Sequence, residues 1–155
     1  EDYDYNQVRL LDTQGVTRLS VPTARFPTSP AILQSIPKVL QAGEVTFADF
    51  KVRNDASYPL RSKMQLGGTY LLFSEKDRQE LFQINQSGWD VFYNRYPNAP
   101  GIITFSRAGF NGNKDQALVY IGIMSNWLAG SGNYILLQKV DGVWVIDQQV
   151  MSWIS

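Results

Sequence analysis

Four acidic residues stand beside apolar neighbours, where burial could raise the pKa of a carboxyl group into the range of a general acid. They are Asp49, Asp55, Glu80 and Asp90. Pairs of carboxyl groups hydrolyse glycosidic bonds when a cleft holds them ~5 to 10 Å apart. Spacing along the chain does not show whether any two of these carboxyl groups lie at that distance. Asp49 and Asp90 are equally well explained as a helix cap and a surface acid. Acid catalysis therefore stays open, and no catalytic residue is assigned.

The chain contains neither His nor Cys. This excludes Ser-His and Cys-His nucleophile pairs, zinc sites built from Cys and His, haem held by His, and thiol redox centres. Ser106 would need a base other than His in order to act as a nucleophile. Residues 111–115 have the oxygens of a turn but lack the full EF-hand pattern. We expect no metal and no cofactor, and the composition favours a protein that is not an enzyme.

Two side chains are candidates for direct contact with a partner. The guanidinium of Arg107 could clamp a carboxylate or phosphate, but a structural ion pair or a helix cap is favoured because no phosphate-loop pattern accompanies it. Trp127 lies in a predicted hairpin loop, where a large ring has less need to be buried. Folding back onto the core is the commoner fate of such a ring, and an interaction anchor at Trp127 is the alternative to test.

Aromatic residues are frequent, with four Trp, eight Tyr and eight Phe. Trp89 on a predicted helix and Tyr120 on a predicted strand could line a cavity for a small ligand between helix and sheet. Core packing is favoured, because aromatic residues at helical spacing are what a helix needs to cover a sheet. The candidate binding residues are therefore Trp127, Arg107, Tyr120 and Trp89.

The elements that position these residues are clearest in the last third of the chain. Turn sequences there separate four runs of strand composition, which are 101–105, 116–124, 134–140 and 143–154. Asp141-Gly142 is typical of a two-residue type I′ hairpin, and the Asn and Gly residues of 111–115 tolerate positive φ. The run 116–124 is apolar on both faces, which predicts a covered central strand.

The final run predicts one apolar face. Trp144, Ile146, Val150 and Ile154 would all lie on the same side if no bulge interrupts the strand.

A helix is expected over about 75–96, capped by Ser74, with Ser87-Gly88 able to break it in two and Pro97 and Pro100 ending it. The first 73 residues predict mixed short elements. These are a strand over 16–21, a helix from Ser29-Pro30 that Pro37 kinks, a helix start at Thr46 with Asp49 completing the cap, and a strand over 69–73.

Length and charge limit the class of protein. The 155 residues fit a single domain over 1–155, with 1–73 covering the core and 74–155 forming helix and meander. Fourteen basic residues balance fourteen acidic ones, which argues against nucleic acid as a partner. No apolar run approaches the ~20 residues of a membrane span. A start at Glu1 predicts removal of a signal peptide and an extracellular or periplasmic protein.

Five segments together resemble a group of uncharacterised bacterial, mostly exported proteins. They are 89–97 (WDVFYNRYP), 101–111 (GIITFSRAGFN), 116–120 (QALVY), 130–137 (GSGNYILL) and 141–146 (DGVWVI). The similarity covers roughly the second half of the chain. Proteins of the group often carry a pair of Cys before the third strand, where this chain has 125–129 (SNWLA). The resemblance implies export and brings no activity with it.

A helix followed by a curved meander that closes with an Asp-Gly-x-Trp strand is also similar to the cystatin-like and nuclear-transport-factor-2-like folds. We therefore expect an α+β domain in which one long or broken helix packs on a four- to five-stranded antiparallel meander. The expected function is that of a non-catalytic exported accessory or interaction domain that recognises a protein, peptide or glycan. A small-ligand-binding or hydrolytic domain with a cavity between helix and sheet is one alternative. A self-assembling surface or filament subunit is another, because a net charge of zero opposes association little.

Overall fold

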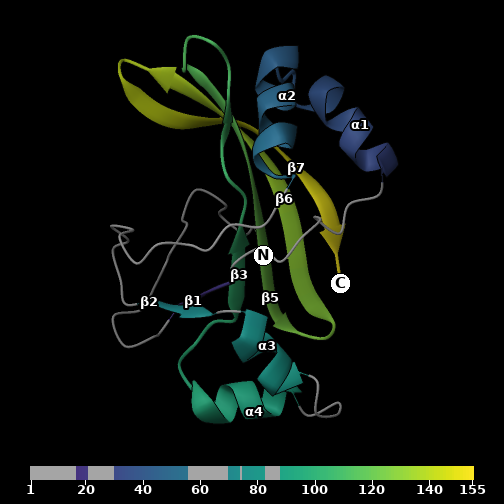
Figure 1. The fold of residues 1–155 in the computed structure, drawn as a ribbon, viewed down its shortest axis with the longest axis vertical. Coiled ribbons are helices and arrows are strands. Elements are labelled where there is room, and N and C mark those ends of the chain that lie inside the picture. The colour runs from purple at the N-terminus through teal and green to yellow at the C-terminus, as the bar shows by residue number, and fades with distance from the viewer. Residues whose placement is uncertain (1–16, 21–29, 56–69, 74, 83–87) are drawn as a thin grey trace, which may run out of the picture.

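The computed structural model describes residues 17–20, 30–55, 70–73, 75–82 and 88–155. Helices and strands alternate along the first two thirds of the chain, and long strands make up the rest (Figure 1). In chain order the elements are β1 Thr17–Ser20, α1 Pro30–Val39, α2 Glu44–Arg53, β2 Tyr70–Phe73, α3 Glu75–Phe82, α4 Gly88–Arg95, β3 Ile102–Phe105, β4 Gly109–Phe110, β5 Gln116–Asn126, β6 Ala129–Val140 and β7 Val143–Ile154.

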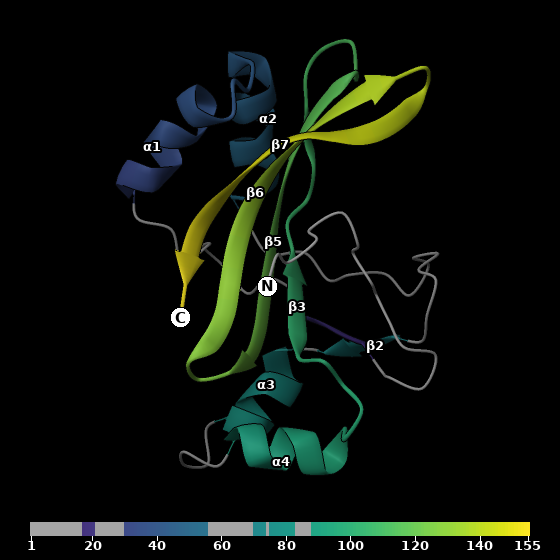
Figure 2. The same cartoon turned by 180° about the vertical axis from the view of Figure 1, so that it is seen from behind.

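All strands of the described part join one sheet in the order β2-β1-β3-β5-β6-β7, and β4 pairs with β5 beside this path. β3, β5, β6 and β7 are antiparallel neighbours, which confirms the predicted α+β class with an antiparallel sheet. The early strands add to this meander, because β1 lies parallel to both β2 and β3. Figure 2 shows the long β5, β6 and β7 strands from behind.

The turn residues predicted between β6 and β7 are confirmed, whereas those predicted before β5 are confirmed only in part. Asp141 and Gly142 join β6 to β7 with φ of 51° and 82°, as a type I′ turn requires. Before β5, the residue at positive φ is Lys114, at 56°, rather than an Asn or Gly. The Asn111 side chain closes this turn by accepting hydrogen bonds from the N–H groups of Asp115 and Gln116.

The two faces of the sheet are defined by the pairing of β5 with β6. Leu118 pairs with Leu136 and Tyr120 with Tyr134, so these four side chains share one face, here called the front face. Side chains alternate along a strand, so odd-numbered residues of β5 and β6 lie on the back face.

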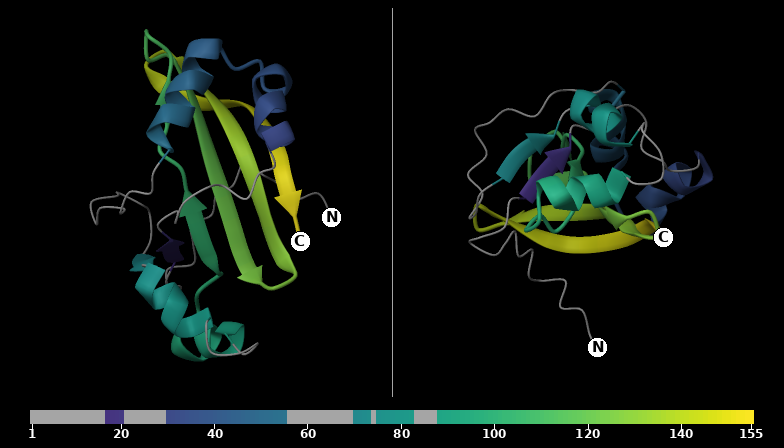
Figure 3. Two further views of the ribbon diagram at one scale, coloured as in Figure 1. Left: turned by 45° about the vertical axis from the view of Figure 1, so that its right-hand side comes forward. Right: turned by 90° about the horizontal axis from the view of Figure 1, so that it is seen from below.

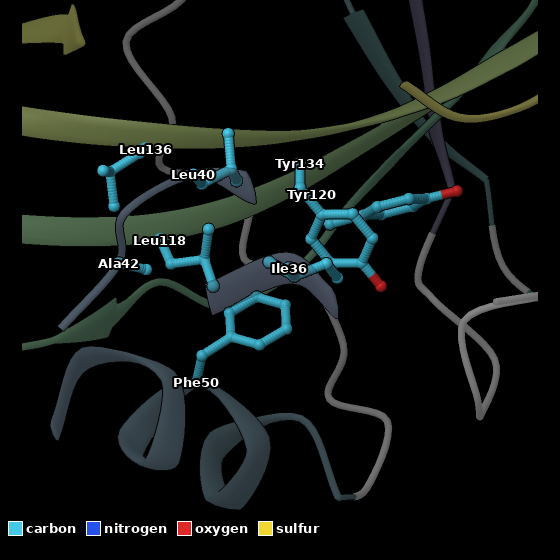
Figure 4. Packing of buried hydrophobic residues seen from close by; sticks show 8 residues of the cluster. All are labelled: Ile36, Leu40, Ala42, Phe50, Leu118, Tyr120, Tyr134 and Leu136. Carbon is cyan, nitrogen blue, oxygen red and sulfur yellow. The ribbon is translucent and has the colours of Figure 1, made fainter. Parts of the chain in front are cut away.

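Helices α1 and α2 cover the front face. Ile36 and Leu40 of α1 and Phe50 of α2 pack on the front-face residues of β5 and β6, and all of them are almost fully buried (Figure 4). The Phe50 ring meets the Tyr134 ring edge-on at 5.9 Å between centroids. Each such side chain contributes about 1.5–3 kcal/mol by leaving water, so this cluster is the main core.

The segment 75–96 does form the predicted broken helix, as α3 and α4, but it does not cover the sheet. Its buried residues Leu81, Trp89 and Phe92 form a second cluster with Ala99 and Ile102, at the start of β3. Figure 1 shows α3 and α4 at one end of the sheet and α1 and α2 at the other. The expectation that this segment packs across the meander is therefore wrong, because α1 and α2 already occupy that surface.

The predicted helix start at Thr46 is wrong. α2 begins at Glu44 after Gly43, and Thr46 lies within its first turn, fully buried. No side chain caps the first N–H groups of α2. Gln116 of β5 instead ties the start of the helix to the sheet, because its Oε1 accepts hydrogen bonds from the Gly43 N–H at 2.9 Å and the Thr46 hydroxyl at 2.7 Å. α1 begins at Pro30 and includes Pro37, while the caps expected from Ser29 and Ser74 lie outside the described residues.

The single apolar face predicted for the last strand is wrong, because two bulges interrupt β7. The register with β6 shifts at Asp147 and again at Ser152. Trp144, Ile146 and Ile154 consequently lie on the back face, whereas Val150 lies on the front face against the main core.

The predicted covering of both faces of β5 holds for part of its length. Ala117 on the back face is buried, as is Ile135 of β6, which pairs with Val119. Val119 and Ile121 are half-buried, and Ile123 at the far end is exposed.

Replacing Gly109 by Ala should destabilise the protein, because a Cβ at this position would overlap the Phe50 backbone of α2. We expect a loss of about 1–3 kcal/mol in the free energy of unfolding, measured by urea denaturation. Gly112→Ala is the matched control, since a Cβ there meets nothing within 4 Å, and we expect it to change stability by less than about 0.5 kcal/mol. Equal midpoints for the two variants would contradict the close packing of α2 on β4.

Candidate functional site

Asp49 is held as a carboxylate. It accepts a hydrogen bond from the Phe110 N–H at 2.8 Å and one from Arg53 Nε at 2.6 Å. The Phe110 hydrogen bond, with Arg53 adding to it against the opposing effect of burial, lowers the pKa of Asp49 below its usual value. A lowered pKa is the opposite of what a general acid needs, so the prediction of a raised pKa is wrong for Asp49. Its role is to fix α2 to β4.

The remaining candidate acids lie at exposed positions on other elements. Glu80 faces Lys76 across one turn of α3 at 3.8 Å, Asp90 stands in the first turn of α4, and Asp55 follows α2. Within the described residues, no group of three or more acidic side chains gathers closely enough to hold a metal ion.

Ser106 and Arg107 follow β3, and both take part in backbone contacts. The Ser106 Oγ accepts a hydrogen bond from the Tyr120 N–H at 2.7 Å. Asn54 binds the Arg107 backbone twice, by accepting from its N–H and donating to its carbonyl, each at 2.9 Å. The Arg107 side chain is exposed and near enough to help lower the pKa of Asp49.

Tyr120 lies inside the front-face core. The Trp153 Nε1–H donates to its hydroxyl at 2.7 Å, and burial raises the pKa of Tyr120 above its usual value. A Cβ at Gly132 would overlap both the Trp153 nitrogen and the Tyr120 hydroxyl, so the absence of a side chain at Gly132 makes this contact possible. Tyr120 is thereby fixed in position by β7 as well as by its ring contact with Tyr134 of β6.

Trp89 belongs to the second cluster and does not face Tyr120. Its ring contacts Phe82, Phe92 and Tyr93, at 5.1 to 5.9 Å between centroids. Its Nε1 is buried and has no hydrogen-bond partner. Of the four candidate binding residues the structure brings together only Trp89 and Trp127, whose centroids lie 6.4 Å apart.

The turn between β5 and β6 carries the most exposed aromatic and aliphatic side chains near these candidates. Trp127 is 48% exposed although its ring edge rests on Phe82, and its neighbour Leu128 is 85% exposed. Ile123 and Met124 at the end of β5 are exposed as well. These four residues are named the hairpin-end patch.

Backbone contacts hold this turn in place. The Tyr93 hydroxyl of α4 donates to the Ser125 carbonyl at 2.7 Å, and the Ser125 hydroxyl donates to the Ala129 carbonyl at 3.1 Å. The Asn126 side chain accepts from the Trp127 N–H at 2.7 Å. Trp127 is thus presented from a turn whose backbone is tied to a helix.

Two parts of the exposed surface could not be identified as candidate sites from residue types alone. Leu128, next to Trp127, is one of them, although an aliphatic residue in a hairpin turn is a usable signal. The exposed back-face side chains of β7 were hidden by its bulges, which alternation along the sequence does not reveal.

Comparisons of the chain with models of protein families, with curated proteins and with solved structures gave no match. No helix in the described part of the chain combines the length and the apolar character needed to cross a membrane.

Asp49→Asn should lower the melting temperature at neutral pH and should make the melting temperature depend less on pH in the acid range. Because the pKa of Asp49 is lowered by folding, its contribution is complete above the unfolded value of about 3.9 and is lost as the pH falls through the lower folded value. The difference in melting temperature between the parent and Asp49→Asn should therefore become smaller below about pH 4. Thermal unfolding from pH 7 to pH 2 measures this.

Asp55→Asn is the control, since it removes an exposed carboxylate just beyond the same helix. We expect the melting temperature of Asp55→Asn to change with pH in the same way as that of the parent. An unchanged acid dependence in Asp49→Asn would refute the carboxylate role assigned to Asp49.

Proposed function

We propose that this protein is a non-catalytic interaction domain that binds a protein or peptide through the hairpin-end patch. The exposure of Trp127 and Leu128 on an anchored turn carries the proposal. A Trp ring supplies a large contact area at small cost in conformational entropy, and such residues dominate binding energy at interfaces. A turn that is already held in place loses little further entropy on binding.

A protein or peptide suits the patch better than a glycan does. Leu128 adds exposed aliphatic surface next to Trp127 in the same turn, and Ile123 and Met124 expose aliphatic and thioether surface on opposite faces of the adjoining end of β5. Such surface is apolar and offers few partners to sugar hydroxyls, whereas it matches the apolar centre of a protein interface.

The alternative of a ligand-binding or hydrolytic cavity has less support. The space between α1, α2 and the sheet holds Ile36, Leu40 and Phe50, which are almost fully buried (Figure 4). Asp49 is engaged in structural hydrogen bonds, so it does not offer the free acid that a hydrolase needs.

We also propose that the domain is exported to the periplasm or the extracellular space, as the sequence resemblance implies, and that its fold is related to the cystatin-like or nuclear-transport-factor-2-like folds. The helix α2 lying across a curved antiparallel meander supports the fold relation.

A photo-crosslinking amino acid placed at Leu128 tests the binding proposal. We expect it to capture a specific protein from the exported fraction of the source cells, and excess parent protein should compete for this adduct. The same crosslinker at Val52 of α2, which is 73% exposed, should not form the adduct. Equal capture from the two positions would count against the hairpin-end patch.

Trp127→Ala should weaken binding of the captured partner by at least about ten-fold, the loss expected for a hot-spot residue. Leu128→Ser is a companion variant that removes apolar surface from a side chain almost fully in solvent. Titration calorimetry and thermal melting separate binding from folding. A lowered melting temperature in Trp127→Ala with unchanged affinity would show that the ring is only structural.

A further inference from the structure

The edge strand β7 exposes an apolar strip on the back face of the sheet. Its register with β6 places Trp144, Ile146, Gln149, Met151 and Ile154 on this face, and these five residues are named the β7 strip. All five are exposed, and Ile154 reaches 72%. Figure 3, seen from below, shows the helices on the other side of β6 and β7. The strip shares no residue with the hairpin-end patch, and the two adjoin on the back face, where Ile123 of the patch lies in one cross-strand row with Ser131 and Ile154.

A strip of this kind favours an uncharged, apolar partner. None of its five residues is charged, and Lys139 of the neighbouring strand β6 lies over the Trp144 ring at 5.7 Å. The chain as a whole has zero net charge, so two copies approach each other without long-range repulsion.

The order of residues along the strip is close to symmetric about Gln149. Trp144 and Ile154 stand five positions before and after it, and Ile146 and Met151 stand three before and two after. A two-fold axis at Gln149 would therefore place each large apolar side chain of one copy against one of the other. The Gln149 amide both donates and accepts, so two such amides can satisfy each other at the axis.

We propose that two copies of this chain pack their β7 strips face to face about a two-fold axis near Gln149 and form a homodimer. Such an interface is isologous, so it closes at two copies and does not continue into a filament.

Edge-to-edge pairing of β7 with a second β7 is opposed by the bulges. The extra residues Asp147 and Ser152 interrupt the regular ladder on both sides of 148–151. Bulges are a common device by which proteins prevent an edge strand from pairing with another chain.

The size of the strip predicts a weak dimer. Because of the two bulges, Trp144 and Ile154 pair with Lys139 and Ser131 of β6, which are only eight ladder steps or about 27 Å apart. A strip about 10 Å wide then covers about 270 Å² on each copy, and the pair buries about 540 Å² in total, below the range of stable interfaces. We therefore expect dissociation constants in the micromolar range or weaker.

Sedimentation velocity over a wide concentration range tests for the dimer, and single cysteines test its geometry, because the chain has no Cys of its own. We expect a short bis-maleimide to crosslink Gln149→Cys into a dimer and to leave Gln148→Cys monomeric, since Gln148 lies on the front face. Ile146→Lys should weaken association by at least about ten-fold. Val52→Lys, an equally drastic change on exposed α2, should leave association unchanged.

Each other outcome overturns the proposal. A protein that stays monomeric at the highest concentration does not use the strip for self-association. Crosslinking at both cysteines indicates edge pairing, where residues 148 and 149 would each approach their mates. A dimer that crosslinks at neither cysteine, or that Ile146→Lys leaves intact while the variant remains folded, forms through another surface.

Discussion

The structure depends on the close approach of α2 to β4 and β5. Gly109 allows the Phe50 backbone to lie against the β4 strand, and the Phe50 ring then reaches Tyr134 in the main core. Hydrogen bonds hold both ends of the helix, at Gln116 and at the Arg107 backbone. Without this docking the front face of the sheet would keep only α1 as its cover, and the main core would lose Phe50.

Side chains of α1 and α2 fill the front face of the sheet, and both surfaces proposed to bind partners lie on the outside of the described part of the chain. The hairpin-end patch and the β7 strip are both exposed, and they contain different residues. The two proposed surfaces adjoin on the back face of the sheet, where Ile123 of the first and Ile154 of the second lie in one cross-strand row. The two helix clusters also separate tasks, because α1 and α2 stabilise the sheet whereas α4 anchors the turn that presents Trp127.

Local patterns predicted the strands of the last third, the Asp141-Gly142 turn and the break between α3 and α4, because each depends on residues near one another in sequence. The docking of α2 could not be predicted, since its contacts join residues 53 to 73 positions apart. Trp127 is 48% exposed while its ring edge rests on Phe82, so the interaction anchor at Trp127 stays a prediction. The bulges of β7 redistributed its apolar side chains between faces in a way that alternation alone cannot show.

The central claim is that the space between the helices and the front face is filled, while the two proposed contact surfaces are exposed. Methyl NMR with a soluble paramagnetic probe, at a concentration where the protein is monomeric, tests this claim most directly. Methyl signals of Leu40, Leu118 and Leu136 should be protected from the probe, and those of Leu128 and Ile154 should be strongly broadened. Strong broadening of the first group would reveal a solvent-filled space between helices and sheet. Protection of the second group in the monomer would show that both proposed contact surfaces are already covered, and either result would contradict the account.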